Sequence, residues 1–94
     1  MKKIIFNDVE YSLEKNYKDA FVIEEVESLC TDYFVSFDYI FGDYSYSKLR
    51  LKGFYDSKNK KVKEINDIKG LEDYIKNYCS FDCKYFLLKK EKDK

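Results

Sequence analysis

The chain contains no histidine, no proline and no tryptophan, and only three of its 94 residues are glycine. Without histidine, the commonest general base and the commonest metal ligand are both missing. A Ser-His-Asp set cannot be assembled, and the sequence has no glycine-rich loop of the kind that cradles phosphates. Arg50 is the only arginine among 18 basic residues. These absences argue against the common hydrolase, metalloenzyme and nucleotide-binding classes, and no cofactor or metal is implied.

Long apolar runs are missing as well. The first one, Ile4, Ile5 and Phe6, ends at Asn7 and Asp8, so it is too short for a signal peptide or a membrane-spanning helix. Three cysteines in a chain without an export signal are expected to be reduced thiols. The sequence therefore predicts a cytoplasmic protein that does not contact a membrane.

Charge is balanced overall but divided between the two halves of the chain. Residues 1–47 carry 4 basic and 10 acidic groups, whereas residues 48–94 carry 14 basic and 8 acidic groups. Such asymmetry is typical of a nucleic-acid contact on one half, or of two halves that attract each other across the fold.

Alternating and helical spacings predict one domain over residues 1–89, followed by a charged, disordered tail over residues 90–94. Strands are expected at residues 4–6, 9–14, 37–41, 48–55 and 84–89. Helices are expected at residues 20–35, capped by Asp19, and at residues 67–79. Five residues of the helical stripes should then be largely buried: Ile23, Val26, Ile68, Leu71 and Ile75.

The predicted fold class is α+β, with a mainly antiparallel sheet of about five strands and two helices packed on one side. The element order ββαββαβ allows a ferredoxin-like arrangement, and the sheet could bend into two layers. Apolar groups on both faces of the final strand, at Tyr85 to Leu88, suggest an interior position for it.

Several segments carry a family resemblance. They are FDYIFGD at 37–43, KLRLKGFY at 48–55, DYI at 73–75, YC at 78–79, Phe81, Cys83 and YF at 85–86. With these segments the chain resembles the YutD-like family of small bacterial proteins over nearly its whole length, most specifically at residues 49–55. It departs at Tyr44-Ser45, where the family commonly has Trp-Gly, and at Asp82, where glycine is common. The resemblance implies a cytoplasmic protein and no particular activity.

The best functional candidate is a basic ladder. Lys48, Arg50 and Lys52 occupy alternate positions of one expected strand, so they line one face about 6.5–7 Å apart, near phosphate spacing. Tyr44 and Tyr46, in the preceding turn expected at residues 42–47, and Phe54 in the strand could stack on bases. The leading hypothesis is a non-enzymatic binding module that contacts RNA, a ribonucleoprotein or an acidic protein surface through the 42–55 hairpin. The candidate partner-binding residues are Asp43, Tyr44, Tyr46, Lys48, Arg50 and Lys52.

The ladder also has a purely structural interpretation. In a ferredoxin-like sheet, strand 48–55 would lie beside strand 9–14, and Glu10 and Glu14 would pair with the ladder cations. An internally compensated face of this kind would have little potential to attract a partner.

An enzyme or redox protein remains the alternative from a different class. It would use Cys79 and Cys83, which are four residues apart, or Asp38 and Asp43 as paired carboxylates. The cysteine spacing is not that of the usual redox motif, and burial as small apolar side chains explains the thiols equally well. The residue pattern favours a non-enzymatic role.

Overall fold

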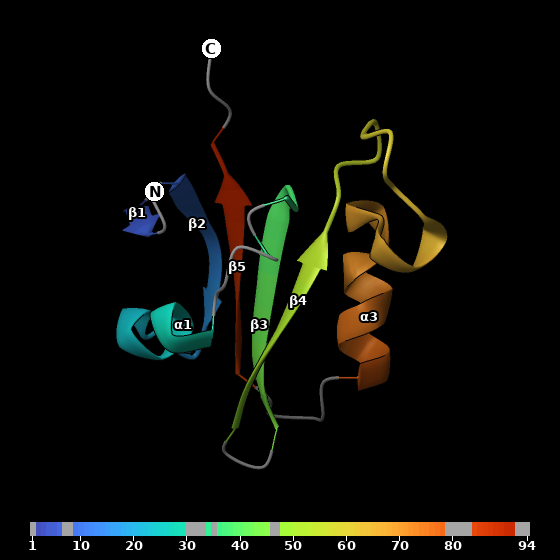
Figure 1. Cartoon of the computed structure of the whole chain (residues 1–94). Coiled ribbons are helices and arrows are strands. Elements are labelled where there is room, and N and C mark those ends of the chain that lie inside the picture. Colours follow the sequence, from blue (N-terminus) through green and yellow to red (C-terminus); the bar gives the residue numbers. More distant parts are fainter. Residues whose placement is uncertain are drawn as a thin grey trace.

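The computed structural model describes residues 2–6, 9–29, 34, 36–45, 48–78 and 84–91. Within this part, one five-stranded antiparallel sheet comprises β1 (Lys2–Phe6), β2 (Val9–Tyr17), β3 (Tyr39–Ser45), β4 (Lys48–Phe54) and β5 (Tyr85–Lys90) (Figure 1). The helices are α1 (Ile23–Leu29) and α3 (Leu71–Tyr78), and two 3-10 turns, Glu64–Asn66 and Ile68–Gly70, precede α3. The α+β class and the five-stranded antiparallel sheet with two helices are confirmed.

The strands lie in the order β1-β2-β5-β3-β4. Strand β5 is therefore in the interior, as expected, and it carries the buried side chains of Phe86, Leu87 and Leu88 on its two faces. The spatial order is not ferredoxin-like, because β5 pairs with both β2 and β3 and so separates β2 from β4. Strand β4 pairs with β3 and ends the sheet.

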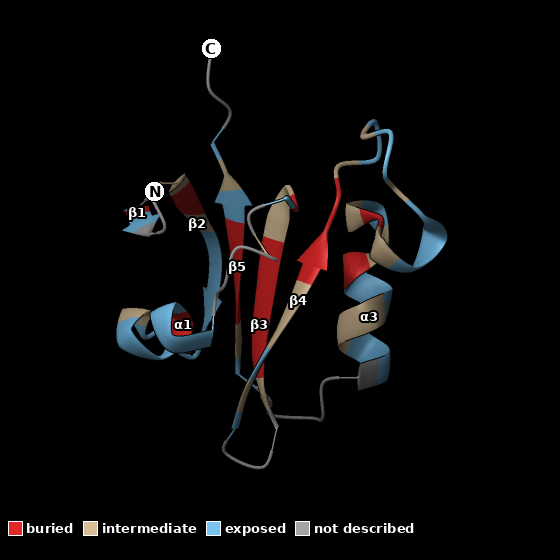
Figure 2. Ribbon diagram, viewed as in Figure 1, coloured by how far each residue is buried: buried red, intermediate tan, exposed pale blue. Residues whose placement is uncertain are grey.

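The two helices cover opposite faces of this sheet. Neighbouring residues of a strand point to opposite faces, and on β3 these are Ile40 and Phe41. Ile40 packs in one apolar cluster with Val26 of α1, whereas Phe41 packs in a second cluster with Leu71 of α3. The prediction that both helices lie on one side is wrong. Strands with apolar groups on both faces need cover on both, and the buried middle of the sheet shows this requirement (Figure 2).

Helix α1 begins later than its sequence pattern suggests. Lys18 and Asp19 have left-handed backbones, with φ of 59° and 53°, and form a turn after β2. The Phe21 N–H donates to Asn16 Oδ1 at 3.0 Å across this turn. Asp19 therefore does not cap the helix, which starts at Ile23.

The helical stripes nevertheless pack as predicted. Val26 and Leu71 are buried, and Ile23, Ile68 and Ile75 are half-buried. No helix among the residues that the structure describes is long and apolar enough to cross a membrane.

At the C-terminal end, β5 continues through Lys90, one residue into the segment expected to be a tail. The Glu91 N–H then donates to the Glu10 carbonyl at 2.9 Å. Residues 92–94 lie outside the described part.

Two glycines allow aromatic rings to lie directly on the sheet. A Cβ atom at Gly42 would stand 2.2 Å from Phe86 Cζ, and one at Gly53 would stand 2.2 Å from Phe37 Cγ. The sequence predicts a turn at Gly42, Asp43 and Tyr44, but these residues belong to strand β3. The β3–β4 connection is residues 46–47, which lie outside the described part.

Candidate functional site

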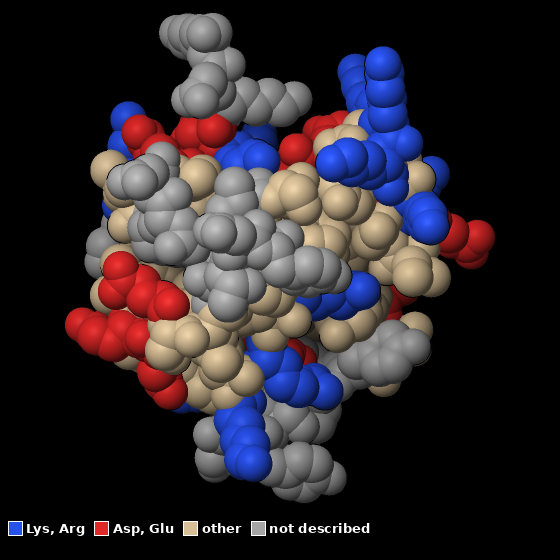
Figure 3. All heavy atoms as spheres, viewed as in Figure 1, with Lys and Arg blue, Asp and Glu red and all other residues tan. Residues whose placement is uncertain are grey.

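The basic ladder exists as a geometric feature of the edge strand. Lys48, Arg50 and Lys52 alternate along β4 on the face that α3 covers, while Leu49 and Leu51 pack with the α1 cluster on the other face. Lys48 is exposed, the Arg50 side chain is 47% exposed, and Lys52 is half-buried. Basic side chains gather over β4 and around the loop that follows it, while acidic side chains gather over α1 (Figure 3).

Arg50 and Asp43, two of the predicted site residues, contact each other. They stand directly opposite in the β3–β4 register. The guanidinium donates from Nε to Asp43 Oδ1 at 3.2 Å and from Nη2 to Oδ2 at 2.6 Å. The Asp43 side chain is only 2% exposed, so this bidentate contact compensates for loss of its hydration and fixes the plane of the guanidinium. Asp43 therefore orients the Arg50 guanidinium from inside the fold, and its own side chain is too buried to contact a partner.

The structural interpretation, in which Glu10 and Glu14 pair with the ladder cations, is wrong. Both residues are on β2, which β5 and β3 separate from β4. Glu10 instead pairs with Lys3 Nζ at 3.3 Å, next to the other edge of the sheet. Asp43 thus offsets one of the three ladder charges, and neither lysine of the ladder forms an ion pair with a residue that the structure describes.

The two lysines of the ladder differ in their surroundings. Lys52 Nζ lies 5.2 Å from the ring centroid of Phe54 and 5.6 Å from that of Tyr74 on α3, within the range of cation–π attraction. Lys48 forms no hydrogen bond or ion pair with any residue that the structure describes. Lys48 is consequently the ladder residue whose charge can be changed with the least effect on folding.

Tyr44 lies on the opposite face of the sheet from the ladder. Its hydroxyl donates to Glu25 Oε2 at 2.7 Å, and Lys84 Nζ lies 4.4 Å from the centre of its ring. Burial, with the hydrogen bond and the charge of Glu25 adding to it, raises the pKa of Tyr44 to about 12. The structure therefore does not bring Tyr44 together with Arg50, and Tyr46 lies outside the described residues.

The raised pKa of Tyr44 predicts a loss of stability in alkali. The unfolded chain releases this proton near pH 10.0 while the folded chain holds it to about pH 12, so the free energy of unfolding should fall through that interval. Tyr44→Phe should remove this decrease of the unfolding free energy with pH, and Glu25→Gln should make the decrease smaller. Urea unfolding at a series of alkaline pH values measures the difference. Equal slopes in the wild type and Tyr44→Phe would contradict the assignment.

The carboxylates proposed as a catalytic pair do not converge. Asp38 Oδ2 accepts hydrogen bonds from the Asp56 N–H and from Asn59 Nδ2, both at 2.8 Å, and so holds the loop after β4. Asp43 is engaged with Arg50, five residues further along an extended chain, or about 17 Å away. Each carboxylate therefore has a structural task of its own. Cys79 and Cys83, the candidate thiol pair, lie outside the described residues.

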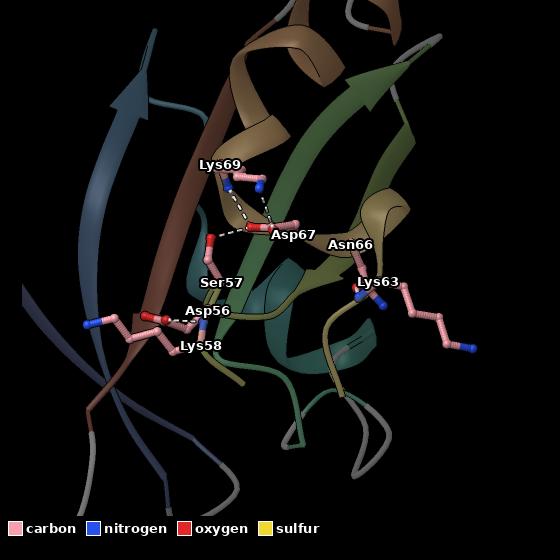
Figure 4. Close-up of polar contacts among 7 residues, drawn as sticks. All are labelled: Asp56, Ser57, Lys58, Lys63, Asn66, Asp67 and Lys69. Carbon is pink, nitrogen blue, oxygen red and sulfur yellow. Dashed lines mark hydrogen bonds and ion pairs between the residues drawn. The ribbon is translucent and has the colours of Figure 1, made fainter. Parts of the chain in front are cut away.

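Asp67 was not predicted from the sequence as a site residue, and it organises the segment beside the end of β4 (Figure 4). Asp67 Oδ1 accepts from the Ser57 hydroxyl and, at 3.1 Å, from the Lys69 N–H, while Lys69 Nζ lies 3.7 Å from Oδ2. The hydrogen bond from Ser57, followed by that from Lys69, lowers the pKa of Asp67. Its position before a helical segment was the available signal, because aspartate is a preferred cap there.

An apolar notch borders the same end of β4. Its volume is about 240 Å³, and Phe34, Phe37, Leu51 and Ile65 supply its apolar walls. Ile65 is 77% exposed. The sequence signal for this feature was the presence of two aliphatic residues, Val62 and Ile65, in the otherwise polar loop 56–66.

A five-stranded antiparallel sheet with one helix on each face defines a class of small α+β domains. Residues 5–89 match the family described as "Putative antitoxin YutD-like", and the chain belongs to this family, which confirms the resemblance seen in the sequence. A relative from Bacillus subtilis (strain 168), described as "Putative antitoxin YutD", is 41% identical over 87 residues, or 93% of this chain and 96% of the relative. A solution NMR structure of protein yutD from B. subtilis is similar, with a TM-score of 0.83 and 39% identity over 99% of this chain and 84% of that one.

Proposed function

We propose that the protein is a non-enzymatic binding module that holds an acidic protein partner on the β3–β4 hairpin, residues 42–55. The name antitoxin, carried by the relative, supports a role exerted through another molecule. The single observation that carries the proposal is the position of the basic ladder on a strand that ends the sheet, with Arg50 held in place by a buried carboxylate.

The geometry favours an acidic protein over RNA as the partner. Single-stranded RNA is typically bound by cations together with aromatic side chains that stack on its bases. Here Tyr44 lies on the opposite face from the ladder and is engaged by Glu25 and Lys84. Phe54 lies on the ladder face but is only 2% exposed, so its ring is not available to stack on a base. A row of cations on a strand fits acidic side chains of a neighbouring polypeptide at the same spacing.

Charge reversal at Lys48 tests the proposal. Crosslinked capture from a lysate of the native cells should recover a partner with the wild type and about tenfold less with Lys48→Glu, because attraction becomes repulsion at that position. Recovery should also weaken with salt. Stability should stay within about 0.5 kcal/mol, since Lys48 is exposed.

Lys58→Glu is the matched control, because it makes the same charge change on the exposed loop beyond β4. It should leave recovery unchanged. Equal recovery with Lys48→Glu and the wild type, or an equal loss with Lys58→Glu, would refute the proposed site. If nuclease treatment abolishes recovery, the partner is RNA and not an acidic protein.

A further inference from the structure

The outer edge of β4 already accepts an extended segment at one end. Just beyond the strand, Tyr55 forms a parallel bridge with Asp67: the Tyr55 N–H donates to the Asn66 carbonyl at 2.7 Å, and the Ile68 N–H donates to the Tyr55 carbonyl at 2.9 Å. Along Lys48–Phe54, no other strand that the structure describes pairs with this edge. An edge strand presents a row of main-chain donors and acceptors to an incoming chain.

The two faces of β4 offer different chemistry to a segment laid along this edge. The face toward α3 carries the ladder, whose alternate positions are all basic. The face toward α1 carries Leu49 and Leu51 and leads to the notch of about 240 Å³, where Ile65 is 77% exposed. A strand that adds to β4 would alternate its own side chains between these two faces, because the side-chain period of a strand is two residues.

We infer that β4 takes up one extended segment of the partner as an additional strand, and that this segment alternates acidic with aliphatic residues. The inference rests on the proposed function and adds to it the mode of binding and the chemistry of the bound segment. Main-chain hydrogen bonds to the edge supply affinity, and the alternating faces supply specificity. Acidic residues stand opposite Lys48, Arg50 and Lys52, and aliphatic residues lie against Leu49, Leu51 and the notch.

A second copy of this chain does not fit the edge. Pairing β4 with β4 in antiparallel fashion would bring two basic ladders onto one face, and like charges across a strand pair are destabilising. Lysines on an edge strand also discourage self-association of sheets. Protection of the edge against self-association would not by itself require an apolar notch beside these cations.

A synthetic peptide tests the inference directly. The probe is a peptide as long as β4, seven residues, that alternates glutamate with valine and has neutral ends. One control has the same composition with the glutamates grouped in one half, and the other is the alternating peptide with N-methylated main-chain amides. Titration followed by amide chemical shifts should move the signals of Lys48–Phe54 and leave those of β1 in place.

Both control peptides should bind at least about tenfold more weakly than the alternating peptide, as should the alternating peptide with the Lys48→Glu protein. Lys58→Glu should bind it like the wild type. Equal binding of either control, shifts centred on another surface, or no binding at about 1 mM peptide would overturn strand addition. If the peptide fails while partner capture still depends on Lys48, strand addition is wrong and the proposed function stands. If capture no longer depends on Lys48, the proposed function is wrong as well.

Discussion

Gly42→Ala should lower the free energy of unfolding by about 3 kcal/mol, because the new methyl group has no space. Its Cβ would lie 2.2 Å from Phe86 Cζ. The Phe86 side chain is fully buried and lies edge-on to Phe21 at 5.2 Å, so the ring cannot move aside without displacing the α1 cluster. For a domain of this size, such a loss is a large part of a typical total stability of about 5–15 kcal/mol.

Gly70→Ala is the matched control, since nothing lies within 4 Å of a Cβ atom at that position. Its effect should stay within about 1 kcal/mol of zero. Phe86→Leu should lower the free energy of unfolding less in the Gly42→Ala background than in the wild type, because the smaller side chain relieves the clash with the added methyl group. Chemical denaturation of the wild type, the three single variants and the double variant measures these free energies of unfolding. Similar stabilities for Gly42→Ala and Gly70→Ala would show that Gly42 is not a platform for Phe86.

Arg50→Ala should destabilise the protein by about 3 kcal/mol, since it leaves the Asp43 carboxylate buried without its cation. The carboxylate is 2% exposed and contacts the guanidinium through two hydrogen bonds. Lys48→Ala, on the same face of the same strand, should change stability by less than about 0.5 kcal/mol. A larger loss of stability for Arg50→Ala than for Lys48→Ala would show that Arg50 stabilises the fold through Asp43, whereas the exposed Lys48 does not.

A double-mutant cycle with Asp43→Asn measures the pair itself. The coupling energy between Arg50→Ala and Asp43→Asn should fall at about 1–3 kcal/mol, because each change removes the same interaction. A coupling near zero would mean that Asp43 and Arg50 act independently, and the account of an oriented guanidinium would then be wrong.

Patterns local to one element were predictable from the sequence. The stripe of Ile23 and Val26, and that of Leu71 and Ile75, identified two helices because burial of one helical face leaves a period of 3.6 residues. Alternation in residues 48–54 likewise identified the ladder. The interior position of β5 followed from its apolar residues on both faces.

Relations between elements were not predictable in the same way. Strand order depends on which apolar faces meet, and β3 and β5 have two such faces each, so the pattern did not decide between one covered side and two. The pairing of Asp43 with Arg50 requires the register of β3 against β4, which depends on where the hairpin turns. Gly42 was assigned to that turn because glycine is common in turns, whereas its role here is to make room for Phe86.

Hydrogen exchange of the protein bound to its captured partner tests the central claim most directly. The account predicts that amides of Lys48–Gly53 that exchange in the free protein become protected in the complex, because the edge of β4 gains a main-chain partner. The amides of β1, at the opposite edge of the sheet, serve as the internal reference and should exchange as before. Protection confined to β1, α1 or another surface, with β4 unchanged, would contradict the account.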